Sequence, residues 1–446
     1  MTEERLTARC LSKKTKYILS AAAIIAVLAL VWVLEQNIPP TSSWSMLFTV
    51  IKKGAIYSLV VVSMNLLNGF TGLFSLGQAG FMLIGAYAYA IFAIPVEAKD
   101  SVYQYYEPLI GFSVPEMLTN AMGGAGTVGG TLGEYLGVII LMLFAGLVTA
   151  GIAFLIGLPV LRLKSDYLAI ASLGFAEIIR TIFQWDGLGS VTNGSNLLRK
   201  FPTFSSSLFP LIVSGLCIAI IVLLINSSYG RAFKAIRDDE IAAEAMGVNL
   251  FKHKQLSFVI SSFFTGIGGA MLAMFQATVN ATPFTSNMTY ELLLIVVIGG
   301  IGSVTGSVIG SFLFIACSEW WLRFLDEGQF LGMDADFMRP GFRKVVFALI
   351  IICIVLFYSR GIMGTREFSW DGVFNFFRTL PSRLVAFFKA LPSRLVAFFK
   401  ALPGRIVKFF KTLPSRISGK VKKLTGKPKN SKNNHINNTD KREEAQ

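Results

Sequence analysis

Ionisable and metal-binding side chains are scarce in this chain of 446 residues. Asp, Glu, Lys and Arg together make up 15% of it, cysteine occurs four times and histidine twice. Cys10 lies in a basic stretch, the other three cysteines lie in or beside apolar runs, and both histidines are isolated. A disulfide framework, a metal site and a cluster of catalytic acids and bases are therefore not expected. We expect no cofactor and no enzyme activity of the chain itself.

Long apolar runs dominate the sequence instead. Hydrophobic residues make up 53% of the chain, and several runs approach the ~20 residues that cross a bilayer as a helix. The runs are continuous and not alternating, which favours helices over a membrane β-barrel. The sequence predicts an all-α fold: a polytopic transmembrane helical bundle of about 9–10 spans, some of them discontinuous, with a basic amphipathic C-terminal tail.

The order of charged and apolar stretches divides the chain into parts. We expect a cytoplasmic N-terminus at 1–16, a transmembrane domain at 17–365 with a polar loop at 227–255, basic repeats at 375–424 and a disordered tail at 425–446. The first apolar run follows a basic segment, as in a secretory signal, but it is long and no small-x-small cleavage site follows it. We interpret it as an uncleaved first span, and we expect both termini in the cytoplasm.

Two of the apolar regions are interrupted by glycine, serine and threonine. At membrane depth such interruptions free backbone groups, which must find partners in protein or in a water-lined cavity, so they favour a substrate pathway. Close helix packing also uses small residues, and both interpretations stay open. The candidate pathway residues are Gly69, Thr71, Gly72, Ser75, Gly77 and Gln78 in the first interruption, and Gly299, Gly300, Gly302, Ser303 and Gly306 in the second.

Two pairs of charged residues within or beside the predicted spans call for an interpretation. Lys52 and Lys53 fit poorly in hydrocarbon, so we assign them to an interfacial helix ahead of a span that starts near Gly54. Glu177 and Arg180 are three residues apart and can face each other on one helix. They form either a functional pair inside the membrane or a structural pair at its outer interface.

A dense polar stretch at 230–249 lies between two runs that are each apolar enough to span a bilayer. Within it, Asp238 or Asp239 can cap a second helix, and Glu240 lies in the first turn, where the helix dipole favours negative charge. Gly247 stands where a helix end favours a residue that tolerates positive φ. The stretch is either a solvated loop helix or a surface that receives force from a partner.

Four segments resemble permeases of bacterial ATP-binding-cassette importers for branched-chain amino acids. They follow in the family's order: NGFTGLFSLGQAGFMLIGAYAYA at 68–90, LRLKSDYLAIASLGFAEIIR at 161–180, GRAFKAIRDDEIAAEAMGVN at 230–249 and ELLLIVVIGGIGSVTG at 291–306. The likeness covers roughly residues 45–365. Where the family has a proline after the last span, this chain has Ser359.

The resemblance implies a permease of the bacterial inner membrane that imports leucine, isoleucine and valine. The implied partners are two ATPase subunits, a second, non-identical permease subunit and an extracytoplasmic binding protein that delivers the substrate. ATP hydrolysis is left to the partner, because the chain lacks the P-loop G-x-x-x-x-G-K-[ST]. In the family the loop helix docks into a cleft of the ATPase, so the expected coupling residues are Arg231, Arg237, Asp238, Asp239, Glu240, Glu244 and Gly247.

Two alternatives stay open. The same family includes permeases for urea, amides and other amino acids, and no residue of this sequence decides among them. A self-contained secondary transporter is a different class, and it needs charged or coordinating residues at mid-membrane for ion coupling. The predicted spans are nearly free of them.

The C-terminal region has a different composition. An 11-residue repeat of the type LPSRLVAFFKA begins near Leu380, and from Asn375 onward 17 Lys and Arg stand against 3 Asp and Glu. This net +14 is almost the whole excess of +15 in the chain. Basic, Phe-rich amphipathic segments lie on anionic membrane surfaces, so we expect anionic lipids as the tail's partner, and not nucleic acid.

A peptide that covers 378–411 should therefore become helical on anionic vesicles, because each basic residue near the surface contributes roughly 1 kcal/mol. Circular dichroism measures the helix content, and the peptide should stay disordered on neutral vesicles and dissociate partly as salt is raised. Equal behaviour on both vesicle types would contradict the membrane-surface interpretation.

Overall fold

The computed structural model describes the middle of the chain and not its ends. The described residues are 13–39, 43–124, 126–163, 165–323, 329–330, 333–334, 345–349, 352, 361–364 and 367. Most of the predicted last span lies outside them, as do Ser359, the repeats at 375–424 and the tail at 425–446.

Helices make up most of the described chain, as the continuous apolar runs predict. The α-helices are α1 (Lys13–Asn37), α2 (Met46–Asn65), α3 (Gln78–Ala93), α4 (Val96–Val102), α5 (Val114–Ala121), α6 (Val128–Val160), α7 (Ser165–Gln184), α8 (Gly189–Thr192), α9 (Leu208–Asn226), α10 (Ser228–Asp238), α11 (Glu240–Ala245), α12 (Leu250–Gln276), α13 (Ser286–Gly299) and α14 (Val304–Ile315). Short 3-10 or π-helical turns are η1 (Ser43–Ser45), η2 (Leu66–Phe70), η3 (Asp186–Leu188) and η4 (Ala316–Trp321). Two antiparallel pairs of short strands complete it: β1 (Leu198–Arg199) with β2 (Thr278–Val279), and β3 (Gln329–Phe330) with β4 (Met333–Asp334).

Seven of these helices are long and apolar enough to cross a membrane. They are α1, α2 continued by η2, α6, α7, α9, α12, and α14 continued by η4. The two interrupted regions add α3 and α13, which are apolar but shorter. The predicted polytopic helical bundle is confirmed, and each interruption separates two distinct helices.

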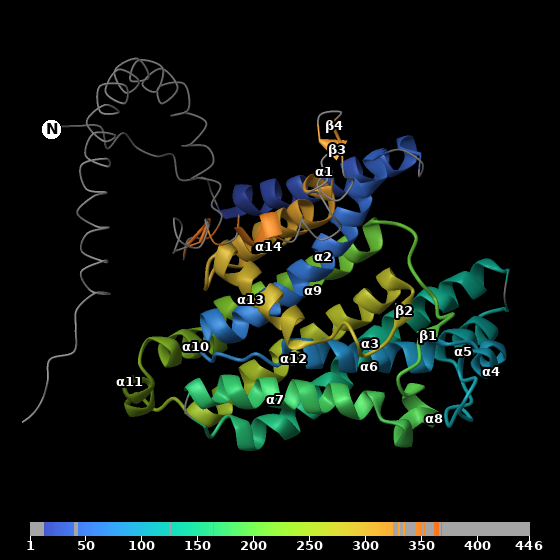
Figure 1. Ribbon diagram of the computed structural model, residues 1–446. Helices are drawn as coiled ribbons and strands as arrows, with labels where there is room; N and C mark the ends of the chain where they lie inside the picture. Colours follow the sequence, from blue (N-terminus) through green and yellow to red (C-terminus); the bar gives the residue numbers. More distant parts are fainter. Residues whose placement is uncertain are drawn as a thin grey trace, which may run out of the picture. The chain divides into compact units, whose positions relative to one another are not determined.

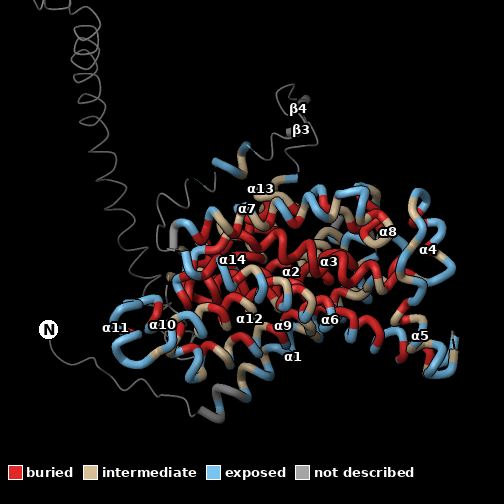
Figure 2. Tube along the Cα trace, turned by 90° about the horizontal axis from the view of Figure 1, so that it is seen from below, coloured by how far each residue is buried: buried red, intermediate tan, exposed pale blue. Residues whose placement is uncertain are grey.

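The buried core of the bundle is formed largely by α2, α3 and α12 (Figure 2). α12 packs against α2, α3 and α6, and α2 also packs against α14. Small residues allow the close approach: a β-carbon at Gly85 of α3 would lie 2.1 Å from the carbonyl oxygen of Gly266 in α12. α1 lies at the periphery of the bundle: only 6% of its apolar segment is buried inside the protein, whereas 78% of the apolar segment of α12 is buried.

α2 starts at Met46 and runs without a break past both lysines, so the expected lead-in belongs to the same helix as the span that follows it. Both charges find partners at the start of this helix. The Lys52 ammonium donates to the carbonyl oxygen of Ser205, and Lys53 Nζ lies 2.5 Å from Glu319 Oε1 in η4. Because these partners satisfy the charges, the helix needs no interruption there.

The loop helices gather at opposite ends of the bundle. α10 and α11 lie at one end, and α4, α5 and α8 lie at the other (Figure 1). The polar stretch at 230–249 therefore forms one end of the bundle, and the loop helices α4, α5 and α8 form the opposite end.

Candidate functional site

The polar stretch folds as two short helices at a sharp corner. Asp239 forms the corner, with an extended backbone between α10 and α11. Its Oδ1 accepts hydrogen bonds from the backbone N–H of Ile241 (2.9 Å) and Ala242 (3.1 Å), so the predicted cap is Asp239 and not Asp238. Glu240, in the first turn of α11, lies 2.6 Å from Lys254 Nζ, which ties α11 to the start of α12.

Gly247 ends α11 with a φ of 85°, as the sequence predicts. Its N–H donates to the carbonyl oxygen of Glu244 (2.9 Å), and the N–H of Val248 donates to that of Ala243 (3.1 Å). This pair of bonds is the Schellman motif, in which the left-handed residue is usually glycine. The Asp239 cap at its start and the Schellman motif at its end together fix the length and direction of α11.

The outer surface of α11 carries two large apolar side chains that the sequence analysis did not single out. Ile241 is 82% exposed and Met246 is 85% exposed, while Ala243 faces inward and is buried. Glu244 is exposed on the same short helix. In the sequence, the signal for a protein interface was two large apolar residues in a mostly polar segment. Such residues are frequent anchors of protein interfaces when they are exposed.

α10 is anchored in the bundle by its inner face. Phe233 and Ile236 are buried almost completely, and Lys234 Nζ lies 5.7 Å from the centre of the Phe70 ring. Arg231 points to the exposed side and donates to Ser228 Oγ at 3.0 Å. The coupling residues expected from the resemblance are therefore close in sequence but face different surroundings.

Arg237 connects α10 with the first interruption. Its Nη1 donates to the carbonyl oxygen of Gly69 at 3.2 Å, while Nε and Nη2 donate to Asp238 Oδ1 at 3.0 and 2.8 Å. Gly72 has a φ of 76°, and a β-carbon on it would lie 2.9 Å from Arg237 Cγ. The arginine side chain therefore lies directly on the broken helix end.

The first interruption runs from α10 toward the middle of α12. η2 ends α2, residues 71–77 are not helical, and α3 begins at Gln78. Gln78 is fully buried, and its amide accepts from Thr265 Oγ1 (2.8 Å) and donates to Ser261 Oγ (3.3 Å). Thr71 and Ser75 are buried as well.

The second interruption separates α13 from α14. Gly300 and Gly302 have φ angles of 120° and 83°, and Ser303 Oγ caps α14 by accepting from the N–H of Gly306 at 3.1 Å. The segment 361–364 lies against this turn: the N–H of Ile362 donates to the carbonyl oxygen of Ile298 at 2.8 Å.

Glu367 adds a second cap to α14 from far along the chain. Its carboxylate accepts from the backbone N–H of Val304 (2.7 Å) and Thr305 (3.1 Å), and from Thr305 Oγ1. A negative charge is stabilised at a helix N-terminus by the unpaired N–H groups there. No local pattern in the sequence indicates this pairing across more than 60 residues.

Asn65, at the end of α2, joins the two interruptions. Its Nδ2 donates to the carbonyl oxygen of Ser303 (3.0 Å) and to Ser307 Oγ (2.8 Å), and its Oδ1 accepts from the N–H of Gly302 (2.9 Å). Asn65 is fully buried. Arg237 Nη1 lies 3.5 Å from the place of a β-carbon on Gly302, so α10 reaches both interruptions.

The structure thus brings Gly69 and Gly72 of the first predicted set and Gly302 of the second together beside Arg237 of α10, whereas Gln78 lies against α12. Their polar side chains are turned into the protein: Ser75, Gln78 and Ser303 have no measurable exposure. In this conformation these residues contribute to packing and to backbone hydrogen bonding. That they line a pathway in another conformation stays a prediction.

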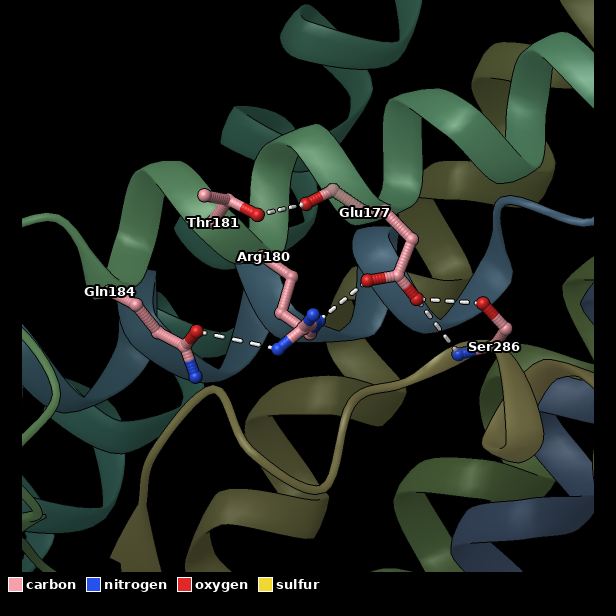
Figure 3. A network of polar contacts seen from close by, with 5 residues as sticks. All are labelled: Glu177, Arg180, Thr181, Gln184 and Ser286. Atoms are coloured by element: carbon pink, nitrogen blue, oxygen red, sulfur yellow. Dashed lines mark hydrogen bonds and ion pairs between the residues drawn. The ribbon is translucent and has the colours of Figure 1, made fainter.

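Glu177 and Arg180 form the predicted pair on α7 and do more than neutralise each other (Figure 3). Arg180 Nε lies 2.7 Å from Glu177 Oε2, and Glu177 Oε1 accepts from Ser286 Oγ at 2.6 Å and Ser286 N at 3.2 Å. The carboxylate therefore holds the N-terminus of α13 against α7. The contacts support the structural interpretation of this pair.

Within the part of the chain that the structure describes, no group of three His, Cys, Asp or Glu could hold a metal ion. The site's polar groups bind one another and the backbone. Such an arrangement can transmit displacement between helices.

Comparison with known proteins identifies relatives of this chain. A family profile described as "Branched-chain amino acid transport system / permease component" matches residues 46–355. The high-affinity branched-chain amino acid transport system permease protein LivM of Salmonella typhimurium is 29% identical over 298 residues, which cover 59% of this chain and 61% of LivM. The LivH permease protein of the same system and organism is 22% identical over 335 residues, 72% of this chain and 95% of LivH. No solved structure matches this chain.

Replacement of Asn65 by alanine should destabilise the fold, because it leaves the N–H of Gly302 without its buried acceptor and removes the donor to Ser303 O and Ser307 Oγ. We expect a loss of about 1–3 kcal/mol in the free energy of unfolding. Thermal unfolding in detergent measures it, with Asn37→Ala at the exposed end of α1 as the control. An Asn65→Ala protein as stable as the control would show that this junction contributes nothing.

Proposed function

Because this chain belongs to the family of permease components of branched-chain amino acid transport systems, we propose that it is the membrane subunit of an ATP-binding-cassette importer. Its cargo in this proposal is leucine, isoleucine and valine, which the printed names of the relatives support. The alignment spans 61% of the length of the LivM relatives of Salmonella typhimurium and Escherichia coli. Urea, amides and other amino acids remain the competing cargoes, and a secondary transporter is the competing class.

The observation that carries the proposal is the shape of α11. A capped and stopped helix of six residues holds Ile241 and Met246 out from the end of the bundle, with Glu240 and Glu244 beside them. Exposed apolar anchors ringed by charged groups are typical of a protein interface. In the proposal an ATPase subunit binds here and supplies the ATP hydrolysis for which this chain has no P-loop.

α10 converts movement of α11 into movement of the transmembrane helices. α11 is joined to α10 through Asp239, and α10 is fixed by the buried side chains of Phe233 and Ile236. Arg237 contacts Gly69 and Gly72 in the first interruption, and Asn65 links the first interruption with the second one. A displacement of α10 therefore acts on both interruptions at once, and we propose that this opens and closes the substrate pathway.

The chain is a multi-pass membrane protein, and its orientation is part of the proposal. α10, α11 and the start of α12 carry Arg231, Lys234, Arg237, Lys252 and Lys254, and basic loops stay on the cytoplasmic side. The end with α4, α5 and α8 then faces outward. A binding protein would deliver substrate there, and a second permease subunit would complete the transporter.

Uptake of labelled leucine by cells that produce the chain together with its partner subunits tests the class and the cargo. Excess isoleucine and valine should compete, whereas urea and acetamide should not. Competition by urea alone would identify urea as the cargo in place of the branched-chain amino acids. Uptake without any ATPase subunit would favour a secondary transporter.

Replacement of both Ile241 and Met246 by serine should weaken retention of the ATPase. Each anchor of an interface contributes more than about 1 kcal/mol, so the pair should lower retention about tenfold or more. Co-purification of the ATPase measures it. Met117→Ser in α5, which removes an exposed methionine at the opposite end, is the control and should have no effect. Full retention by the double variant would contradict docking at α11.

Arg237→Lys should separate docking from transport, because lysine keeps the charge but loses the planar fork that reaches Gly69 and Asp238 together. Uptake should fall about fivefold or more, within the usual range of coupling free energies, while ATPase retention stays normal. Arg231→Lys, on the exposed side of α10, should transport normally. Normal uptake by the Arg237→Lys variant would show that Arg237 does not transmit movement from α10 to the substrate pathway.

A further inference from the structure

An open groove of about 1020 Å³ lies beside the candidate site and shares Arg237 with it. Residues of α1, α9, α10 and α14 line it, together with Phe70, Gly302 and Glu367. It begins next to Arg237 and runs along the outer face of α9. α9 is a candidate membrane span, and six of its residues between Gly215 and Asn226 line the groove.

The walls of the groove are apolar and its end at α10 is charged. Ile218 and Val222 of α9 and Val308 of α14 form part of the apolar walls, and Lys234 and Arg237 of α10 stand at the charged end. The same side of the bundle carries the other basic residues of the polar loop. The groove is therefore amphipathic along the direction in which α9 crosses the membrane.

Lys234 is the cation most available to a ligand. Its ammonium lies over the Phe70 ring, and among the described residues no carboxylate forms an ion pair with it. Arg237 keeps Nη1 on Gly69 and two nitrogens on Asp238, which leaves part of its fork of five N–H groups for a further acceptor.

Glu367 also lines the charged end, but its oxygens are engaged. They accept from the N–H groups at the start of α14 and from Thr305 Oγ1. Two cations and one carboxylate line the groove, and Arg237 is paired with Asp238 beside it. Lys234 is therefore the cation left to attract an anionic group such as a phosphodiester.

We propose that the groove binds one glycerophospholipid of the cytoplasmic leaflet. The acyl chains lie along Ile218, Val222 and Val308, and the phosphate is held by Lys234 with help from Arg237. Basic pockets between membrane helices on the cytoplasmic side are suited to lipid headgroups, since apolar walls and cations then meet matching groups of one molecule. The lipid adds to the anchorage of α10, the helix that carries Arg237. The proposal needs α9 in the membrane with α10 on the cytoplasmic side, and it does not depend on the identity of the transported substrate.

Native mass spectrometry of the purified full chain tests the proposal by counting bound phospholipid. Lys234→Gln removes the cation, and Val222→Trp fills the apolar part. Each should lower the lipid-bound fraction about fivefold, which corresponds to about 1 kcal/mol. The matched controls are Arg231→Gln, which removes a charge from the exposed side of α10, and Leu223→Trp, which places the same new side chain one residue away at an exposed position. Both controls should keep the wild-type lipid count.

Three results would overturn the proposal. Equal lipid counts in both test variants and both controls would show that no lipid uses the groove. Failure of the Val222→Trp chain to co-purify with the second permease subunit, with the lipid count of the purified chain unchanged, would make the groove a subunit interface. Displacement of the lipid by inorganic phosphate at equal concentration would show that the apolar walls do not contribute. Because the readout is bound lipid, a failed transport assay leaves this test unaffected.

Discussion

Every helix that is interrupted inside a membrane protein exposes backbone N–H and C=O groups that lipid cannot satisfy. The central part of this structure depends on how that demand is met. Asn65 supplies hydrogen bonds from the end of α2 to the turn between α13 and α14, and Ser303 and Glu367 cap α14. The two interruptions can exist because each is completed by groups from elsewhere in the chain.

Carboxylates from distant positions bind the N-terminal N–H groups of three helices. Glu35 of α1 accepts from the N–H of Ser207 at the start of α9, Glu177 of α7 accepts from Ser286 at the start of α13, and Glu367 accepts from Val304 and Thr305 at the start of α14. An acidic group at a helix N-terminus gains from the dipole and from the unpaired N–H groups. These residues are among the few acidic groups near the spans, and each fastens one helix to another.

The same network gives the polar loop its mechanical connection to the membrane part. A loop helix that only covered the end of the bundle could move without consequence for the spans. Here Arg237 contacts the first interruption, and Asn65 carries that contact to the second. The glycines at these turns allow close contact and permit the backbone to change, because they tolerate φ angles that other residues rarely adopt. Coupling between a cytoplasmic partner and a pathway needs both properties.

The sequence by itself determined the spans, the two interruptions and the capped helix of the polar loop. Each of these follows from local composition: the length of an apolar run, the clustering of glycine around residues 69–77 and 299–306, an aspartate at 238 or 239 before a helix and Gly247 after it. The likeness in four segments also indicated the family that the profile match then established. What only the tertiary structure decided is which of these pieces touch. Asn65, Glu367 and the contact of Arg237 with Gly69 join residues that are far apart in the chain, and local patterns carry no information on such pairs. The unbroken course of α2 past Lys52 and Lys53 was also decided there, because the partners of both lysines, Ser205 and Glu319, come from other parts of the fold.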